Sequence, residues 1–222
     1  MTFSTQWDKI YQQGNQLSIW PWSDLISYIN RHSKPDGDLY SVLELGFGVG
    51  ANIPFFLSNG IDYYGTEGSI TAVEDAKRRF DGQRLKLVCV DFTKIIPFDG
   101  PFHLVVDRCS LTLNSTNAIR KCIELVHDKM KPGAKFIGID WFSTKHSDFS
   151  KGLEGDDPNT RYGFTEGQFL DVGKVHFSDE EHLFKLFSEF RFIAIEHKVV
   201  KNCISSIGQF GSYNFVCEKR KK

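Results

Sequence analysis

The sequence predicts an α/β protein with a doubly wound, seven-stranded and mostly parallel sheet that includes an antiparallel last strand. Two observations lead to this prediction. Between residues 40 and 141, short apolar runs alternate with segments of helical periodicity, as expected of βαβ units with right-handed crossovers. After residue 190, two β-rich runs are joined by a polar turn, so they pair most simply as an antiparallel hairpin at the sheet edge.

The predicted strands are short apolar or β-branched runs at 40–45, 62–66, 85–90, 102–106, 135–141, 190–200 and 209–218. The predicted helices have helical apolar spacing or a capping signal, and cover 24–32, 52–57, 69–80, 116–130 and 178–187. Asn59-Gly60 and Lys131-Pro132-Gly133 are stop signals for two of them. Ser178-Asp-Glu-Glu181 reads as a capping box that opens the last helix, with Leu183 and Phe184 facing inward.

Two segments interrupt the alternation within what we predict to be a single domain of residues 1–222. Residues 1–38 are aromatic and polar, and form a predicted N-terminal cap. Residues 142–173 carry five glycines and one proline, and are too long for an ordinary connection. Long loops in compact domains are usually functional or disordered, so we expect an inserted loop here that contributes to the binding of a substrate.

Composition excludes several classes of function. The chain has 222 residues, of which 41% are hydrophobic and 25% charged, as in ordinary globular proteins. Its formal net charge of −1 argues against a nucleic-acid partner. Neither a membrane-spanning run nor a signal-peptide pattern is found. The five cysteines are odd in number and at least 13 residues apart, which argues against disulfides and metal binding and favours a reducing cytoplasm.

The strongest signal in the sequence is a glycine-rich turn between a predicted strand and a predicted helix, in the stretch Val42 to Asn52. Gly46, Gly48 and Gly50 are needed there because the backbone turns sharply and must approach a ligand without a Cβ in the way. With Ala51 in the place of the third glycine, the same string also satisfies the dinucleotide-binding fingerprint.

Three acidic positions distinguish between possible ligands of this turn. Glu44 lies two residues before the first glycine, where a carboxylate would repel a pyrophosphate but suits a cationic amino group or a sulfonium. Glu67 ends the second strand, 21 residues beyond Gly46, where an acid can accept both ribose hydroxyls. Asp91-Phe92 ends the third strand and places a carboxylate and an aromatic ring beside an adenine. A purine nucleoside with an amino acid tail fits all three.

These motifs resemble those of the class I S-adenosylmethionine-dependent methyltransferases, over about residues 39–218. The stretches that carry the resemblance are Val42 to Gly50, Tyr64 to Ser69, Val90 to Phe92, Val105 to Arg108 and Met130 to Lys135. The terminal hairpin matches the family's antiparallel last strand. The N-terminal segment and Val175-His-Phe177 look most like small bacterial members found among surface-polysaccharide genes. Phe47 departs from the family pattern, where a smaller residue is usual.

The resemblance implies S-adenosyl-L-methionine as cofactor and a set of residues that bind it. Glu67 would hold the ribose, Asp91 and Phe92 the adenine, and Asp107 or Arg108 would lie beside the methionine end. The leading aromatic residues Trp7, Tyr11 and Trp20 would fold over the cofactor. The full predicted set is Trp20, Glu44, Gly46, Phe47, Gly48, Gly50, Asn52, Glu67, Gly68, Ser69, Asp91, Phe92, Asp107 and Arg108.

The predicted acceptor is a small molecule, methylated on a hydroxyl of a sugar or sugar-like metabolite. Its pocket is expected between residues 141–173 and the cap, with Asp140, Trp141, Asp148 and Arg161 as further polar or aromatic candidates. His146 and His176 are the predicted catalytic bases, because histidine titrates near neutral pH. The sequence at Asp107 to Ser110 lacks the Asn/Asp-Pro-Pro-Tyr motif of many amino-methylating enzymes.

Two other classes of function remain open. An NAD-dependent oxidoreductase shares the glycine turn, but Glu44, the aromatic lead and the terminal hairpin argue against it. A non-catalytic cofactor-binding module that regulates a partner would share the cofactor residues, but the long polar loop argues for an acceptor. We predict no metal site, no nucleic-acid or membrane partner, and a monomer or homodimer in the cytoplasm.

Overall fold

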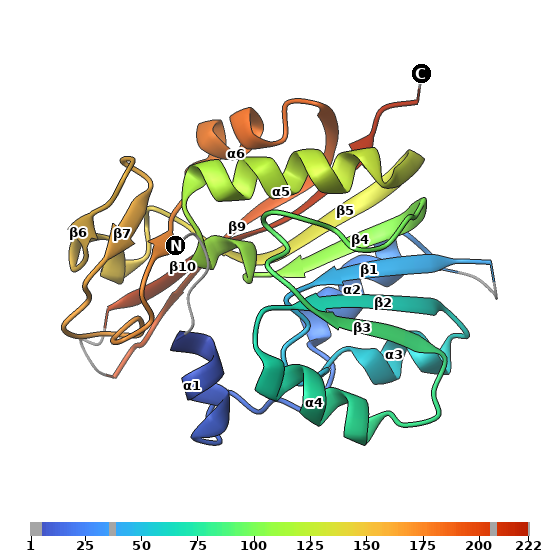
Figure 1. Cartoon of the computed structure of the whole chain (residues 1–222). Coiled ribbons are helices and arrows are strands. Elements are labelled where there is room, and N and C mark those ends of the chain that lie inside the picture. The colour runs from blue at the N-terminus through green and yellow to red at the C-terminus, as the bar shows by residue number, and fades with distance from the viewer. Residues whose placement is uncertain (1–5, 36–38, 205–207, 222) are drawn as a thin grey trace.

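The computed structural model describes residues 6–35, 39–204 and 208–221. Its centre is a seven-stranded sheet with the order β3-β2-β1-β4-β5-β10-β9 (Figure 1). The strands are β1 (Ser41–Leu45), β2 (Asp62–Glu67), β3 (Leu85–Cys89), β4 (Phe102–Arg108), β5 (Met130–Phe142), β9 (Phe190–Lys201) and β10 (Gln209–Lys219). The predicted doubly wound α/β sheet of seven strands is thereby confirmed.

The order of the strands produces a change of winding direction beside β1. From β1 the chain adds β2 and β3 on one side, then returns to add β4 and β5 on the other. Strands β1, β2, β3, β4 and β5 pair in parallel, whereas β10 pairs antiparallel with both β5 and β9. Strand β10 is therefore the antiparallel last strand that the sequence predicts.

Helices cover both faces of the sheet (Figure 1). On one face, α2 (Ser23–His32), α3 (Ile53–Ser58) and α4 (Ile70–Arg79) pack against one side of the strands. On the other face lie α5 (Thr116–Asp128) and α6 (Glu180–Leu186). Successive side chains of a strand point to opposite faces of the sheet, so one strand contributes to the cores on both faces. In β1, Val42 packs in the core beneath α2, α3 and α4, and Leu43 and Leu45 pack in the core beneath α5 and α6.

The predicted loop insertion 142–173 is more regular than expected. It contains a 3₁₀ turn, η2 (Ser147–Ser150), and the strands β6 (Leu153–Glu154) and β7 (Thr160–Tyr162). With β8 (Val175–His176), these strands form a second, three-stranded sheet. Its core is a third apolar cluster that includes Phe142, Phe164, Phe169 and Phe177.

Several element bounds differ from the sequence prediction. Strand β5 begins at Met130, five residues before the predicted start, because Met130 already pairs with Phe102 of β4 and the register then shifts before Lys135. The cap of α6 is Asp179, whose Oδ1 accepts from His182 N at 2.8 Å, so the prediction of a box opened by Ser178 is wrong. Phe184 is 42% exposed, not inward.

The N-terminal cap contains a helix that the sequence analysis did not predict. This helix, α1 (Gln6–Gln12), lies beside α4. A second element that was not predicted is the short 3₁₀ turn η1 (Leu111–Leu113), which follows β4. Residues 1–5 and 36–38 of the predicted cap, and residues 205–207 between the two last strands, lie outside the described residues.

Candidate functional site

A cavity of about 320 Å³ lies at the carboxyl ends of the parallel strands, beside the change of winding direction. In open α/β sheets ligands bind in this crevice. The turn after β1, the ends of β2, β4 and β5, the 142–173 insertion and the N-terminal segment supply its walls. The lining residues are Trp7, Tyr11, Gln16, Ser18, Trp22, Glu44, Gly46, Phe47, Gly48, Val49, Ala51, Asn52, Glu67, Phe92, Arg108, Cys109, Ser110, Leu113, Asn114, Asp140, Phe142, Gln168, Phe169, Val172 and Phe210.

The turn after β1 depends on its glycines. Gly46, Gly48 and Gly50 have φ values of 64°, 57° and 84°, in the left-handed region. A Cβ on Gly46 would lie 2.2 Å from the Cβ of Ser110, and one on Gly48 would lie 2.9 Å from the hydroxyl oxygen of Tyr11. The turn therefore brings bare backbone against the cavity, as the sequence predicts for a cofactor cradle.

Glu67, at the end of β2, is fixed by three backbone donors. Its Oε2 accepts from Gly48 N at 2.9 Å, and its Oε1 accepts from Gly68 N at 2.8 Å and Ser69 N at 2.9 Å. Burial raises the pKa of this carboxyl, and the three N–H groups oppose that shift. The glycine turn thus holds an oriented acidic acceptor at the cavity wall.

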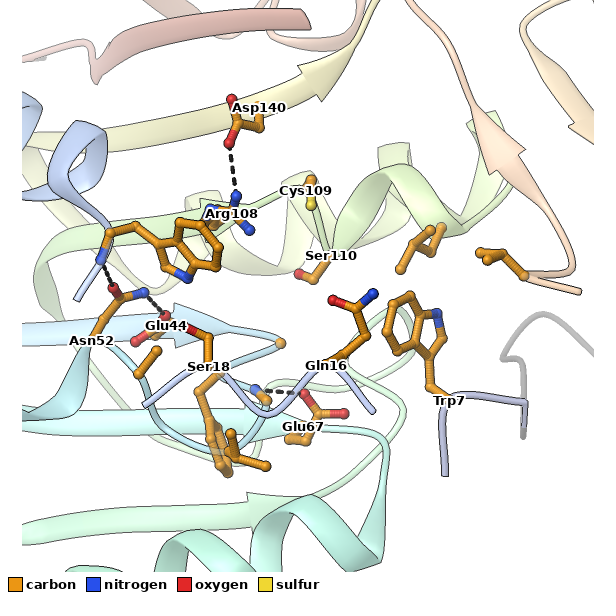
Figure 2. Close-up of a pocket in the computed structure, with 18 of the residues that line it drawn as sticks. Trp7, Gln16, Ser18, Glu44, Asn52, Glu67, Arg108, Cys109, Ser110 and Asp140 are labelled. Carbon is orange, nitrogen blue, oxygen red and sulfur yellow. Dashed lines mark hydrogen bonds and ion pairs between the residues drawn. The ribbon is translucent and has the colours of Figure 1, made fainter. Parts of the chain in front are cut away.

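Glu44, near the end of β1, is a buried carboxyl with two polar neighbours, of which Figure 2 shows Asn52. Asn52 Nδ2 donates to its Oε1 at 2.8 Å, and Tyr63 Oη donates to its Oε2 at 2.5 Å. Burial raises the pKa of Glu44 to about 7, partly offset by these two hydrogen bonds. A cation bound here would favour the ionised carboxylate, so the position fits a ligand ammonium group.

Arg108, at the end of β4, connects the N-terminal segment to β5. Its guanidinium carbon lies 3.4 Å from the centre of the Trp22 ring, and its Nη2 donates to Asp140 Oδ2 at 2.9 Å (Figure 2). Asp140 also pairs with Lys198 of β9, at 3.0 Å. The backbone N–H of Trp22 donates to Asn52 Oδ1 at 3.1 Å, which joins this group to the Glu44 site.

Helix α1 brings aromatic side chains over the cavity. Trp7 and Tyr11 are among the lining residues, as the prediction of a leading aromatic cover requires. The helix is anchored by Asp8, whose Oδ1 accepts from Ser69 Oγ at 2.6 Å and from Thr71 N at 3.1 Å at the start of α4.

The structure brings together eight of the fourteen predicted cofactor residues as cavity lining. These are Glu44, Gly46, Phe47, Gly48, Asn52, Glu67, Phe92 and Arg108. Gly50, Gly68 and Asp91 are each next to a lining residue in sequence and Ser69 is two positions after Glu67, but none of the four lines the cavity. Asp91 Oδ1 accepts from the Thr93 hydroxyl at 2.5 Å, and its Oδ2 lies 2.8 Å from Lys94 Nζ.

The other two predicted cofactor residues, Trp20 and Asp107, do not line the cavity either. Trp20 is 76% exposed, and Trp22 takes the lining position instead. Asp107 is fully buried, and its Oδ1 accepts from Ser110 Oγ and from Leu111 N, which shapes the turn after β4. Burial raises the pKa of Asp107 to about 6.

The two predicted histidine bases are not among the lining residues. His176 is fully buried, its ring lies within hydrogen-bonding distance of Thr116 Oγ1 and Ser178 Oγ, and burial lowers its pKa to about 3. His146 is also buried, but its Nε2 lies 3.4 Å from Oε1 of the lining residue Gln168. The geometry gives neither ring a direct contact with the cavity.

Of the other four residues predicted to bind the acceptor, one lines the cavity and three do not. Asp140 lines the cavity, whereas Trp141 is buried in the main core. Asp148 accepts from Gln168 N at 2.6 Å. Arg161 stacks over Phe149, with 4.2 Å between guanidinium carbon and ring centre, and does not line the cavity.

Sequence reasoning missed several lining residues on both sides of the cavity. Trp22 follows the predicted Trp20 by two positions. Ser110 comes two residues and Asn114 six residues after β4, and a place after the carboxyl end of a strand is the signal that could have found them. The remaining missed polar residues are Gln16, Ser18 and Gln168, which lie in irregular segments with no sequence signal.

Neither a metal centre nor a membrane span is found in the part of the chain that the structure describes. Among these residues no group of three or more His, Cys, Asp or Glu side chains could hold a metal ion. Across residues 6–35, 39–204 and 208–221, no helix has both the length and the apolar character needed to cross a bilayer.

Comparison with known proteins finds a family model that matches part of the chain. Residues 42–133, which include β1, β2, β3, β4 and the glycine turn, match the family described as "Methyltransferase domain". No curated protein sequence matches the chain significantly.

Solved structures of S-adenosylmethionine-dependent methyltransferases share the fold. One, from Methanosarcina mazei, is 14% identical with a TM-score of 0.70, and the match covers 91% of this chain and 100% of that one. Another, from Clostridium acetobutylicum, is 15% identical with a TM-score of 0.64 and 96% coverage of both chains. The 1,6-didemethyltoxoflavin-N1-methyltransferase of Burkholderia thailandensis, solved with S-adenosylhomocysteine, is 14% identical with a TM-score of 0.64, covering 96% of this chain and 85% of that one.

The domain match is confined to residues 42–133, and the solved structures show that the fold of the chain is the one these methyltransferases share.

Proposed function

We propose that this protein transfers the methyl group of S-adenosylmethionine to a hydroxyl of a small molecule, a sugar or sugar-like metabolite, bound between the insertion 142–173 and the N-terminal cap. The observation that carries the proposal is the convergence of the glycine turn, Glu44 and Glu67 on one cavity. This cofactor needs three features in its site: backbone without side chains beside it, a carboxylate for its ammonium group, and an oriented acid for the two hydroxyls of its ribose.

The residues present fit the cofactor at both of its ends. Glu44 would bind the ammonium group of the methionine part, since its Asn52 and Tyr63 neighbours orient the carboxyl without neutralising it. Glu67 would accept the ribose hydroxyls, and Phe92 would pack against the adenine. When bound, the cofactor supplies a methyl carbon already activated by a sulfonium.

The chain's own contribution is to exclude water and align the acceptor. Trp7, Tyr11 and Trp22 come from the N-terminal segment and close the cavity from one side. Holding two reactants in a productive orientation contributes on the order of 7 to 11 kcal/mol to lowering a barrier. None of the histidines in the described part of the chain lines the cavity. We therefore assign the protein's role to positioning the reactants. A catalytic base at His146 or His176 stays a prediction.

The acceptor side combines rings with polar groups, which supports a sugar-like molecule. Phe142, Phe169 and Phe210 offer apolar faces, and Asn114 and Gln168 offer amides. Binding sites for small polar molecules typically have this composition of mostly apolar walls with few oriented polar groups.

The test is methyl transfer itself. The protein is incubated with S-adenosylmethionine and a panel of monosaccharides and nucleotide sugars, and release of S-adenosylhomocysteine is measured together with the mass of the product. We expect a gain of 14 mass units on an acceptor oxygen. Transfer to a nitrogen or carbon centre, or none across the panel while S-adenosylhomocysteine binds, would contradict the hydroxyl acceptor and leave the cofactor assignment standing.

An NAD-dependent oxidoreductase is disfavoured by the same geometry. The buried Glu44 carboxyl lies close to the glycine turn, where a dinucleotide would place its pyrophosphate. Location in the cytoplasm and a monomeric or dimeric state stay predictions.

A further inference from the structure

Gln168, at the rim of the cavity, is held by the helical turn η2 of the insertion. Its backbone N–H donates to Asp148 Oδ2 at 2.6 Å. Gly167, directly before it, has φ of 86°, and a Cβ at Gly167 would lie 2.4 Å from the same oxygen. The backbone therefore approaches Asp148 closely at this point, which fixes the position of the Gln168 Cα from which the side chain extends.

The orientation of the Gln168 amide follows from the tautomer of His146. Nδ1 of His146 accepts a hydrogen bond from Asp148 N at 3.1 Å, so it carries no proton. With Nδ1 unprotonated, the proton of the ring is on Nε2, and burial, which lowers the pKa of His146, favours this neutral form. Nε2 lies 3.4 Å from Gln168 Oε1 and donates to it. The amide group therefore turns its oxygen to the histidine and its NH₂ group away from it.

The His146 ring is itself held in place by aromatic packing. Its centre lies 5.0 Å from that of Phe169 and 5.3 Å from that of Phe210, both of which line the cavity. Phe142, 5.9 Å away, also packs against the histidine and lines the cavity. The ring that orients Gln168 is thus built into the apolar wall beside it.

Asn114, which follows η1, is oriented the other way: its NH₂ group is bound by the protein and its amide oxygen is left for a ligand. Its Nδ2 donates to Ser110 O and to Leu111 O, each at 3.3 Å. These two bonds engage the NH₂ group and leave the oxygen Oδ1 as the atom with which Asn114 meets a ligand in the cavity. The acceptor side therefore has one amide that donates and one amide that accepts.

We propose that Gln168 and Asn114 recognise a donor–acceptor pair on the methyl acceptor: a ring-bearing molecule in which a hydroxyl lies beside a carbonyl, ether or hydroxyl oxygen. The hydroxyl donates to Asn114 Oδ1, the neighbouring oxygen accepts from Gln168 Nε2, and the ring packs on the phenylalanine wall. His146 acts through Gln168 and is a positioning residue. This inference rests on the proposed function and specifies the substrate class.

The first experiment examines the tautomer directly. Protein labelled with ¹⁵N-histidine and saturated with S-adenosylhomocysteine is studied by long-range ¹H–¹⁵N NMR, with His146 assigned by the loss of its signals in His146→Phe. We expect a neutral ring with its proton on Nε2 from pH 7 to 8. A proton on Nδ1, or a ring that titrates in this range, would overturn the orientation of Gln168.

The second experiment measures recognition with matched probes. Binding of 2-methoxyphenol, methoxybenzene and phenol to the protein saturated with S-adenosylhomocysteine is compared by ligand-observed NMR. 2-Methoxyphenol carries a hydroxyl beside an ether oxygen, methoxybenzene lacks the hydroxyl, and phenol lacks the ether oxygen. One net hydrogen bond contributes about 1 kcal/mol, so we expect 2-methoxyphenol to bind about fivefold more tightly than either.

A nearly isosteric variant separates recognition from general packing. Gln168→Glu replaces the NH₂ donor by an oxygen, which cannot donate to an ether, so the preference for 2-methoxyphenol over phenol should vanish. Gln83→Glu adds the same charge at an exposed position outside the cavity lining and should keep the preference. Equal binding of the three probes, binding of none, or a preference that survives in Gln168→Glu would show the proposal to be wrong.

These outcomes are distinct from a failure of the proposed function. Loss of the cofactor assignment appears as absence of S-adenosylhomocysteine binding in the wild-type protein, before any probe is added. A protein that binds S-adenosylhomocysteine and shows no preference among the probes contradicts the Gln168 and Asn114 assignment alone.

Discussion

The backbone N–H of Gly48 donates a hydrogen bond of 2.9 Å to Oε2 of Glu67, and so joins the glycine turn after β1 to the end of β2. The bond has two consequences. It gives the turn a partner beyond its own backbone, and it aligns the carboxylate at the cavity wall before a ligand arrives. Two motifs that are 19 residues apart in sequence form one structural unit.

Removing the Glu67 carboxylate should weaken cofactor binding strongly. A hydrogen bond to a charged group contributes about 1.5 to 3 kcal/mol, so Glu67→Ala should lower the affinity for S-adenosylhomocysteine about ten- to hundredfold. Calorimetric titration measures the change, and thermal unfolding of the free variant controls for loss of the bonds to Gly48, Gly68 and Ser69. An unchanged affinity in a folded variant would refute the ribose assignment.

Cofactor binding should depend on pH through Glu44. Burial raises the pKa of this carboxyl to about 7, so below pH 7 the free protein holds it protonated and uncharged. An ammonium ligand requires the carboxylate, so binding must release a proton there, and affinity should fall almost tenfold for each pH unit below 7. Titrations with S-adenosylhomocysteine between pH 5.5 and 8 test this.

The matched control for that prediction is Glu44→Gln, which cannot ionise. Its affinity should be low and flat over the same pH range. A wild-type affinity that is equally flat, or that rises as the pH falls, would exclude Glu44 as the ammonium site.

Two neighbouring tryptophans should differ in their effect on cofactor binding. Trp22 stacks on Arg108 and lines the cavity, so Trp22→Ala removes apolar contact surface from a bound ligand and frees the guanidinium to move. Burying about 40 Å² less apolar surface costs about 1 kcal/mol, so Trp22→Ala should weaken S-adenosylhomocysteine binding about fivefold. Trp20→Ala is the control, since Trp20 is 76% exposed and should leave the affinity unchanged. The reverse pattern would restore the original prediction for Trp20.

His176 should matter for stability and not for cofactor binding. It is fully buried, with Thr116 and Ser178 as hydrogen-bond partners, so His176→Gln should destabilise the fold by about 1 to 3 kcal/mol while the folded protein binds S-adenosylhomocysteine normally. Denaturant unfolding and calorimetry measure the two effects. Weakened cofactor binding at unchanged stability would contradict this role.

The pH dependence of stability gives His176 a second signature. Burial lowers its pKa from 6.5 to about 3, so between these values the unfolded chain binds a proton that the folded protein does not. The contribution of His176 is therefore complete above pH 6.5 and is lost as the pH falls toward 3. Between pH 7.5 and 5, the wild-type protein should lose more unfolding free energy than His176→Gln.

Local sequence was sufficient for the fold and for part of the cavity lining. Strands such as 41–45 and 102–108 are marked by apolar runs, and the glycine turn has a steric requirement that appears directly in the sequence. Glu44 and Glu67 could be predicted because they lie at fixed positions relative to strand ends, where the topology brings them to one edge.

The rest depended on contacts between distant segments. Trp22 and not Trp20 lines the cavity because its backbone bonds to Asn52 and its ring meets Arg108, neither of which a periodicity can indicate. Ser178 does not cap α6 because His176 and the backbone of Phe142 bind it instead. Gln168 lies in an irregular segment, and its place is set by Asp148 and His146.

The most direct test of the account is a calorimetric titration of the purified protein with S-adenosylhomocysteine at pH 7.5, with NAD titrated in parallel. Micromolar binding of S-adenosylhomocysteine and no binding of NAD is the predicted result. Binding of NAD with no heat from S-adenosylhomocysteine, or silence with both, would contradict the claim that Glu44, Glu67 and the glycine turn form a methyl-donor site.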